Sequence, residues 1–247
     1  MINRILLVFI FLFSVVAAQA QDLKWLVAPS LGIDVGGAVV IPLSDIPDGA
    51  KGSPKIMPNI GVGVQYNIHE KWNLGIELNY HVLSFTASAD VISQPYYSDD
   101  GSYAIYFSGE TETECELKFV EFPLMAYYKL NSNWSIVIGM YYSRIIDSRF
   151  EVEGSNGWIS ENKEDTDTAP LPGTQNVAYD FNDEMSSHDL GAIIGFQYKI
   201  GAKILFWSRF HAGLNSVFKP EFQNISYELY QMRLSTGVSF TLFSGEK

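Results

Sequence analysis

The stretch from Asn59 to Ser84 constrains the fold of this chain more than any other part of the sequence. Apolar residues alternate with small or polar ones up to Ile68, a short polar break follows, and the alternation resumes at Trp72. Two period-two segments joined by a tight polar turn are typical of a β-hairpin. One side of this hairpin is entirely aliphatic or aromatic, so it faces either the second sheet of a soluble sandwich or the lipid around an outer-membrane barrel.

The same pattern recurs along the chain and predicts eight strands, at residues 31–41, 60–68, 72–82, 118–130, 134–142, 190–200, 204–214 and 232–242. The connections between them run long, short, long, short, long, short, medium. The short turns lie at 69–71, 131–133 and 201–202, and the long irregular stretches at 42–58, 86–114 and 148–187. Short periplasmic turns and long external loops alternate in this way in an eight-stranded antiparallel up-and-down transmembrane β-barrel, but not in a Greek-key sandwich. We therefore predict an all-β fold of this kind, with long acidic external loops.

Aromatic residues on the apolar faces mark both ends of the expected membrane span. Tyrosines precede the short turns, tryptophans follow two of them, and two further tyrosines lie eight residues beyond those tryptophans. At a ~3.3 Å rise per residue and a ~40° tilt, such a segment climbs roughly 20 Å, close to the height of the apolar band of small barrels. Aromatic rings prefer the membrane interface. We therefore expect an interface aromatic girdle of Tyr66, Trp72, Tyr80, Tyr128, Trp134, Tyr142 and Tyr198.

Residues 1–20 carry the pattern of a secretory signal peptide. One cation, Arg4, precedes an apolar run from Ile5 to Val16, and Ala18-Gln19-Ala20 fits an A-x-A cleavage site. The apolar run is shorter than the ~20 residues that a transmembrane helix needs. We predict cleavage after Ala20 and a single outer-membrane β-barrel domain over residues 21–247.

The charge and the cysteine content exclude some functions and some sources of stability. The formal net charge is −12 and no basic stretch is present, so nucleic-acid binding is not expected. The chain has one cysteine, Cys115, and therefore no intrachain disulfide framework.

Several segments resemble the PorT-type outer-membrane β-barrel family. They are YNIHEKWNLGIELNY, FVEFPLMAYYKL, DLGAIIGFQYKI, WSRFHAGLNSVF and the final GVSFTLF, in the order of the expected strands. The resemblance implies a small barrel of the Gram-negative outer membrane, and the namesake of the family is associated with a protein secretion system. The long acidic third loop and the four-residue tail after Phe243 depart from the compact pattern of that family. The resemblance is specific for architecture and weak for activity.

Charged residues at inward positions of the expected strands form the main candidate site. An eight-stranded barrel is just wide enough inside to be filled by side chains, and buried charges need hydrogen-bonded partners. One interpretation is a structural polar plug, and the other is a gated proton or ion path. The expected barrel-interior polar network consists of Asp34, Glu77, Glu121, Lys129, Asp189, Lys199, Arg209 and Arg233.

Acidic residues crowd the expected external loops, where they either form a solvated surface or bind divalent cations. Carboxylates suit Ca²⁺ or Mg²⁺, and such cations would bridge acidic loops to the anionic outer leaflet. No calcium-loop motif is present, so no specific metal site is named. The candidate loop carboxylates are Glu110, Glu112, Glu114, Asp165 and Asp167.

No combination of residues points to catalysis or to a bound cofactor. Ser187, His188 and Asp189 are adjacent, and adjacent residues of a strand point to opposite faces. His81 and His211 lack a placed third metal ligand, and the acidic neighbours of Cys115 disfavour a reactive thiolate. We therefore expect a non-enzymatic protein without a cofactor.

The expected function is structural or interaction-based. Its partners would be outer-membrane lipid and, at the external loops, divalent cations and lipopolysaccharide. An accessory role in protein secretion, with secretion-system proteins as partners, is the alternative that the resemblance implies. A narrow channel and a soluble ligand binder of lipocalin shape are the remaining hypotheses.

Overall fold

The computed structural model describes residues 25–46, 49–97, 104–161, 177–222 and 228–244, and these residues form antiparallel strands with two short 3₁₀ helices. The strands that correspond to the predicted ones are β1 (Trp25–Ile41), β3 (Ile56–His69), β4 (Trp72–Tyr97), β5 (Ala104–Lys129), β6 (Trp134–Ser160), β8 (His188–Ile200), β9 (Ile204–Ser216) and β10 (Glu228–Phe240). The shorter elements are η2 (Leu43–Asp45), β2 (Lys51–Pro54), β7 (Val177–Asp180), η3 (Asn182–Glu184) and β11 (Phe243–Ser244).

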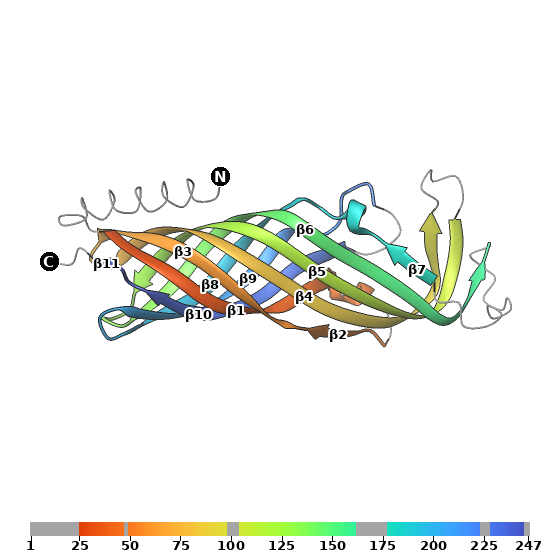
Figure 1. The fold of residues 1–247 in the computed structure, drawn as a ribbon, viewed down its shortest axis with the longest axis horizontal. Coiled ribbons are helices and arrows are strands. Elements are labelled where there is room, and N and C mark those ends of the chain that lie inside the picture. Colours follow the sequence, from red (N-terminus) through yellow and green to blue (C-terminus); the bar gives the residue numbers. More distant parts are fainter. Residues whose placement is uncertain (1–24, 47–48, 98–103, 162–176, 223–227, 245–247) are drawn as a thin grey trace, which may run out of the picture.

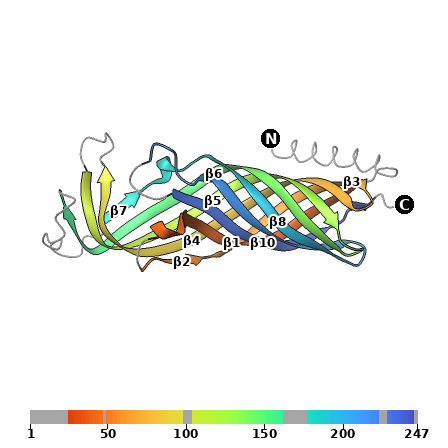
Figure 2. The same cartoon turned by 180° about the vertical axis from the view of Figure 1, so that it is seen from behind.

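The long strands pair with one another in the order in which they follow along the chain. The antiparallel order is β1-β3-β4-β5-β6-β8-β9-β10, and residues 30–41 of β1 also pair with residues 228–239 of β10. The strands run obliquely around an elongated body, with β11 and the short turns at one end (Figures 1 and 2). The predicted all-β, antiparallel, up-and-down arrangement is confirmed, and each predicted short turn joins two neighbouring strands.

The predicted long loops are wrong over much of their length, because three strands continue far beyond the expected boundaries. β4 runs to Tyr97 and β5 starts at Ala104, so most of the stretch 86–114 is a paired hairpin. β6 continues to Ser160, and β7 pairs with it within the stretch 148–187. β2 likewise lies within the stretch 42–58. The outer face of these segments is polar, so they lack the apolar outward face that marks the predicted strands. Their inner face packs into an apolar core.

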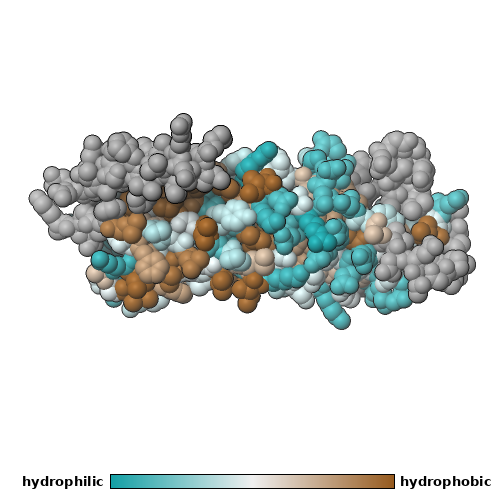
Figure 3. Space-filling view, viewed as in Figure 1, coloured by the Kyte–Doolittle hydropathy of each residue, from teal (hydrophilic) through white to brown (hydrophobic). Residues whose placement is uncertain are grey.

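We call the part of the strands that adjoins the short turns the lower barrel. It extends to about Val82 on β4, Val120 on β5 and Tyr142 on β6. Its outward side chains are apolar and exposed: Ile76 and Ile194 are each 59% accessible and Trp72 is 36% accessible. These residues do not lie between two sheets, which rules out the sandwich arrangement for the described residues. Figure 3 shows hydrophobic residues gathered toward the end that carries β11.

Beyond that level, the distribution of side chains is reversed. We define the upper extension as β2, β7 and η3 together with residues 83–97 of β4, 104–117 of β5 and 148–160 of β6. Its outward side chains are largely charged or polar, and its inward side chains form the largest apolar core of the described residues. This core includes Leu83, Phe85, Phe107, Cys115, Leu117, Phe150, Val152 and Phe181, and it continues onto Phe218 and Leu229. No helix among the described residues is long and apolar enough to cross a membrane.

Candidate functional site

The inward side chains of the lower barrel form a buried polar cluster, and Asp34 of β1 lies at its centre. Asn59 and Ser235 donate hydrogen bonds to Oδ1 of Asp34, at 2.7 and 2.5 Å. His81 Nδ1 lies 2.6 Å from Oδ2, and its ring stacks on Phe119 with the centroids 5.1 Å apart. The carboxylate of Asp34 is fully buried, and three side chains from three different strands hold it in place.

Glu121 of β5 and Arg233 of β10 form a second, equally buried contact. Arg233 Nη2 donates to Glu121 Oε2 and also to His211 Nδ1, the latter at 2.9 Å. The guanidinium of Arg233 lies over the rings of Phe119 and Tyr141, at 5.0 and 5.3 Å from their centroids. An arginine with a carboxylate partner and two aromatic rings around it is stabilised in an interior where an isolated charge would be very costly.

The two contacts join into one cluster through His81. Its Nε2 lies 3.6 Å from Glu121 Oε1, and His211 Nδ1 lies 3.5 Å from the same oxygen. Within the described part of the chain, His81 Nε2, His211 Nε2, Glu121 Oε1 and Arg233 Nε are buried without a hydrogen-bond partner. Buried polar atoms almost always have partners. These atoms are therefore the least satisfied hydrogen-bonding groups of the cluster.

Glu77 of β4 and Arg209 of β9 form a separate ion pair closer to the short turns. Two parallel hydrogen bonds of 2.7 and 2.8 Å connect the guanidinium to both carboxylate oxygens. Asn79 and Tyr127 donate to the same carboxylate at 3.1 and 3.3 Å, and Arg209 lies 4.7 Å from the ring of Trp207. Such bidentate pairs fix geometry as well as energy. The pair links opposite parts of the barrel wall.

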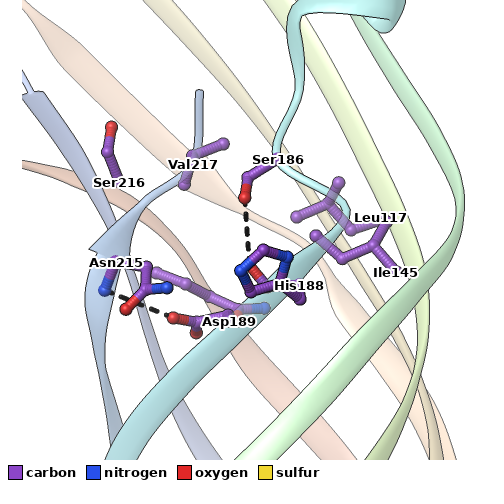
Figure 4. A pocket seen from close by; sticks show the side chains of 9 residues that line it. Leu117, Ile145, Ser186, His188, Asp189, Asn215, Ser216 and Val217 are labelled. Carbon is purple, nitrogen blue, oxygen red and sulfur yellow. Dashed lines mark hydrogen bonds between the residues drawn. The ribbon is translucent and has the colours of Figure 1, made fainter. Parts of the chain in front are cut away.

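Asp189 does not form a triad with its neighbours. It accepts hydrogen bonds from the Tyr141 hydroxyl at 2.7 Å and from the Asn215 backbone N–H at 3.4 Å. Ser187 Oγ lies 3.4 Å from His188 Nδ1, on the exposed side. A small space of about 10 Å³ lies beside His188, Asp189 and Asn215, which is room for about one water molecule. Figure 4 shows Asp189 directed toward Asn215 and away from the His188 ring.

Six of the eight residues expected in the interior network are brought together in this way, and two are not. Lys129 and Lys199 lie partly buried at the ends of β5 and β8, where their backbone N–H groups bond to the short turns. Sequence reasoning did not include the neutral partners of the charged residues. The alternation along the strands places these partners on the inward side, but nothing in their residue types distinguishes them from other inward residues. They are Asn59, Asn79, Tyr127, Tyr141 and Ser235.

The residues expected in the aromatic girdle lie on the outer face, and several contact one another near the short turns. Trp72 and Tyr128 lie 4.9 Å apart, Trp134 and Tyr198 4.7 Å, and Tyr66 lies 4.5 Å from Trp25. Farther up the wall, Tyr142 stacks on Phe122 and Tyr80 is partly buried.

The candidate carboxylates of the external segments form no metal site in the described structure. Glu110, Glu112 and Glu114 lie on the outward face of β5, while Asp165 and Asp167 lie outside the described residues. Among the described residues, no three histidine, cysteine, aspartate or glutamate side chains gather closely enough to hold a metal ion. Cys115 is fully buried in the apolar core, and this burial raises the pKa of its thiol, which disfavours a thiolate.

Several solved structures follow a similar course over most of this chain. Ail of Yersinia pestis, solved with the heparin analogue sucrose octasulfate, is 9% identical over 89% of this chain and 99% of its own, with a TM-score of 0.41. OprG of Pseudomonas aeruginosa is 9% identical over 91% and 98%, with a TM-score of 0.36. Neisserial surface protein A is 10% identical over 87% and 97%, with a TM-score of 0.40. Similarity at this level carries no argument about function.

No curated protein matches the chain. The sequence model described as "Outer membrane protein beta-barrel domain" matches residues 17–219, which is most of the sequence. Together with the antiparallel up-and-down strands and their exposed apolar faces, this match shows that the chain belongs to the outer membrane protein beta-barrel domain family and is a protein of the outer membrane.

Proposed function

We propose that this protein is a closed eight-stranded transmembrane barrel that anchors a surface-exposed contact region, with no enzymatic role. The observation that carries the proposal is the change of outward chemistry along β5. Leu124 and Phe122 are exposed apolar residues of the lower barrel, whereas Glu114 and Glu112, farther along the same face, are carboxylates. Lipid favours the first pair and water the second. The upper extension would therefore stand outside the membrane as a folded unit.

The filled interior supports an anchoring role over a conducting one. The cross-section at the level of Asp34 is occupied by the hydrogen-bonded cluster, and the apolar core of the upper extension lies above it. A conducting path would have to break the Arg233–Glu121 contact and displace Phe119 from beside it. Separating these two charges inside the barrel would leave both without a partner, which is strongly unfavourable.

The upper extension carries a pair of carboxylates that suits a divalent cation. Glu112 of β5 and Glu153 of β6 are cross-strand partners, and both are exposed on the outward face. Like charges directly opposite each other destabilise a sheet. The neighbouring pair, Glu114 and Glu151, is neutralised by Lys55 and Arg149, but no described lysine or arginine forms a salt bridge with Glu112 or Glu153. A Ca²⁺ or Mg²⁺ ion would relieve this repulsion and bridge the pair to lipopolysaccharide.

The test of this contact is protease resistance of the upper extension in bilayers containing lipopolysaccharide, with Mg²⁺ or with a chelator. We expect the chelator to speed cleavage of the extension in the wild type several-fold, because the bridging cation is removed. The double variant Glu112→Gln/Glu153→Gln should be indifferent to the chelator, and Glu110→Gln serves as the matched control. Equal cleavage of the wild type with and without chelator would refute cation bridging.

The alternative is an accessory role in an outer-membrane secretion system, which rests on the resemblance to the PorT-type family. Deleting the gene and measuring secreted cargo separates the two roles, since a surface anchor would leave secretion unchanged. Mass spectrometry of the mature protein tests the proposed division of the chain. A mature N-terminus at Gln21 would support residues 1–20 as a cleaved signal peptide.

A further inference from the structure

The ladder between β6 and β8 crosses the whole apolar face of the lower barrel. It runs from Trp134 opposite Tyr198, next to the short turns, to Arg144 opposite His188. At a ~3.3 Å rise and ~40° tilt, the ten residues from Trp134 to Arg144 climb roughly 25 Å, which is the height of the apolar band of small barrels. In the membrane orientation proposed above, Arg144 and His188 therefore lie at the level where acyl chains end and lipid headgroups begin.

Arg144 is an exposed cation without an acidic partner in the described part of the chain. Its Nη1 donates a hydrogen bond to Ser187 Oγ at 3.0 Å, and its Nε–Nη2 edge has no partner among the described residues. Lys118, an outward cation of β5, is instead neutralised by Asp147 at 2.7 Å. An anion that approaches Arg144 therefore meets a guanidinium whose charge is not already compensated.

His188 adds a second hydrogen-bonding group next to Arg144. Ser187 Oγ, which accepts the hydrogen bond from Arg144, also lies 3.4 Å from His188 Nδ1. When that hydroxyl donates to Nδ1, the proton of the neutral imidazole is on Nε2, which has no described partner. The imidazole ring stacks on Tyr142, with the centroids 6.4 Å apart and 25° between the planes. Ser187 and Tyr142 thus hold both groups in place on the outer face.

The side chains directly below this pair are apolar and exposed. Tyr142 and Leu190 are cross-strand partners, two residues nearer the short turns, and they are 40% and 48% accessible. A ligand at this position can therefore contact apolar side chains with one end and an uncompensated cation with the other. A lipid with an anionic headgroup has this combination, whereas a free anion would make no use of Tyr142 and Leu190.

We propose that Arg144 and His188 bind the terminal phosphate of an outer-leaflet lipid. Guanidinium groups bind phosphate through parallel charge-assisted hydrogen bonds, and the open Nε–Nη2 edge of Arg144 supplies two of them. His188 Nε2 donates a third to another phosphate oxygen, and the acyl chains follow Tyr142 and Leu190 down the wall. The inference rests on the proposed transmembrane barrel and adds a lipid contact that needs no divalent cation.

Lipid retention by the full-length protein tests this contact. The protein is purified in a nonionic detergent with chelator present throughout, mixed with equal amounts of phosphatidic acid and phosphatidylcholine of the same acyl chains, and analysed by native mass spectrometry. Phosphatidic acid carries a terminal phosphate, whereas the phosphate of phosphatidylcholine is esterified with a choline cation. We expect the wild type to retain phosphatidic acid several-fold more than phosphatidylcholine. Wild-type retention without this preference would overturn the proposal, whatever the variants do.

The variants Arg144→Gln and Arg149→Gln provide the matched comparison, because each removes one exposed arginine charge from β6. Arg149 is already bonded to Glu151 through two hydrogen bonds of 2.8 and 2.7 Å. Arg144→Gln should reduce the retention of phosphatidic acid to that of phosphatidylcholine, and Arg149→Gln should leave the preference unchanged. Full preference in a folded Arg144→Gln protein would contradict the site. An equal loss in Arg149→Gln would contradict it as well, because net charge would then set the preference.

Inorganic phosphate distinguishes a lipid site from a site for free phosphate. Added at the concentration of the lipid, it should leave retention unchanged, since it gains no contact with Tyr142 and Leu190. Displacement of the lipid by this phosphate would overturn the lipid as the occupant. A protein that needs detergent but shows no preference contradicts this inference alone, whereas a protein that stays in solution without detergent contradicts the proposed barrel too.

Discussion

The lower barrel and the upper extension share three strands, yet their inward and outward chemistries are opposite. On β5, Leu124 and Phe122 are outward and apolar while Glu121 is inward and charged. Farther along the same strand, Glu114 is outward and charged, and Cys115 is inward and part of an apolar core. From Glu110 to Tyr128 the alternation of faces continues without interruption, and the even-numbered residues of this stretch point outward. The surroundings of the outer face change from lipid to water, and the outward side chains change from apolar to charged accordingly.

This comparison teaches that the two regions are stabilised by different interactions. The lower barrel contains paired charges that would be costly if left alone, and the upper extension contains tightly packed aromatic and aliphatic side chains. Removing one side chain should therefore leave an unpaired buried charge in the lower barrel and a cavity in the upper extension. The following four predictions test that difference.

The largest effect is expected from Arg233→Met in the lower barrel. Glu121 would remain buried without its cation, which should lower the free energy of unfolding by about 3–5 kcal/mol. Urea titration followed by heat-modifiable gel migration measures this loss. The double variant Glu121→Gln/Arg233→Met should recover much of it, because no unpaired charge is left. A double variant as unstable as the single one would argue that packing, and not charge pairing, holds this level of the barrel.

Phe150→Ala should produce a loss of about 3 kcal/mol that is confined to the upper extension. Phe150 is buried in the apolar core and contacts Phe218 at a centroid distance of 4.9 Å. Hydrogen exchange should rise along residues 104–117 and 148–160 while the strands near Tyr128 and Tyr198 stay protected. Increased exchange around Tyr128 as well would show that the two regions unfold as one unit.

Introducing a cation on the outer face should affect the two regions differently. Ile194→Lys lies in the apolar band, where a lysine costs about 2–3 kcal/mol. Glu110→Lys is also outward but belongs to the upper extension, so its effect should stay within about 0.5 kcal/mol. Parallel urea titrations in the same vesicles compare the two. Equal losses would contradict the assignment of lipid to the lower face and water to the upper one.

The smallest effect concerns pH and the surface of the upper extension. The hydrogen bond from Lys55 holds the pKa of the Glu114 carboxyl below its usual range. A lowered pKa contributes stability above the pKa of the unfolded chain, and that stability is lost as the pH falls through the folded-state pKa. Protease resistance of the extension should therefore decline slightly on acidification, and Glu114→Gln should remove this part of the decline. A decline of the same size in Glu114→Gln would assign it to other groups.

The sequence predicted the lower barrel well because lipid-facing strands require an uninterrupted apolar face, as in the run from Trp72 to Tyr80. It did not predict the upper extension. The outward residues Glu110, Glu112 and Glu114 resemble a solvated loop, and the inward positions of the same segment begin with threonines before they reach Cys115. Pairing with β4 and β6 fixes this segment as a strand, and such long-range pairing is not visible in local composition.

The interior site was predictable in most of its charged residues, but not in its neutral members or in its contacts. Parity along the strands places Glu77 and Glu121 inside, and Arg209 and Arg233 likewise. Which acid meets which base depends on the register and the stagger of strands far apart in the chain. Glu121 and Arg233 are separated by 112 positions, and Glu77 and Arg209 by 132. No local pattern carries that information.

The pairing of β1 with β10 has a consequence for how the chain is assembled. Asp34 receives a hydrogen bond from Ser235, which is 201 positions away, so the carboxylate gains this partner only after nearly the whole chain has been made. Contacts of such long sequence separation form slowly. Until then the edge strands of the incomplete sheet have unpaired backbone groups, which can pair with other chains. The newly made chain therefore needs to be bound by another protein until β10 has been made. A truncation before β10 should abolish insertion altogether instead of yielding a smaller barrel.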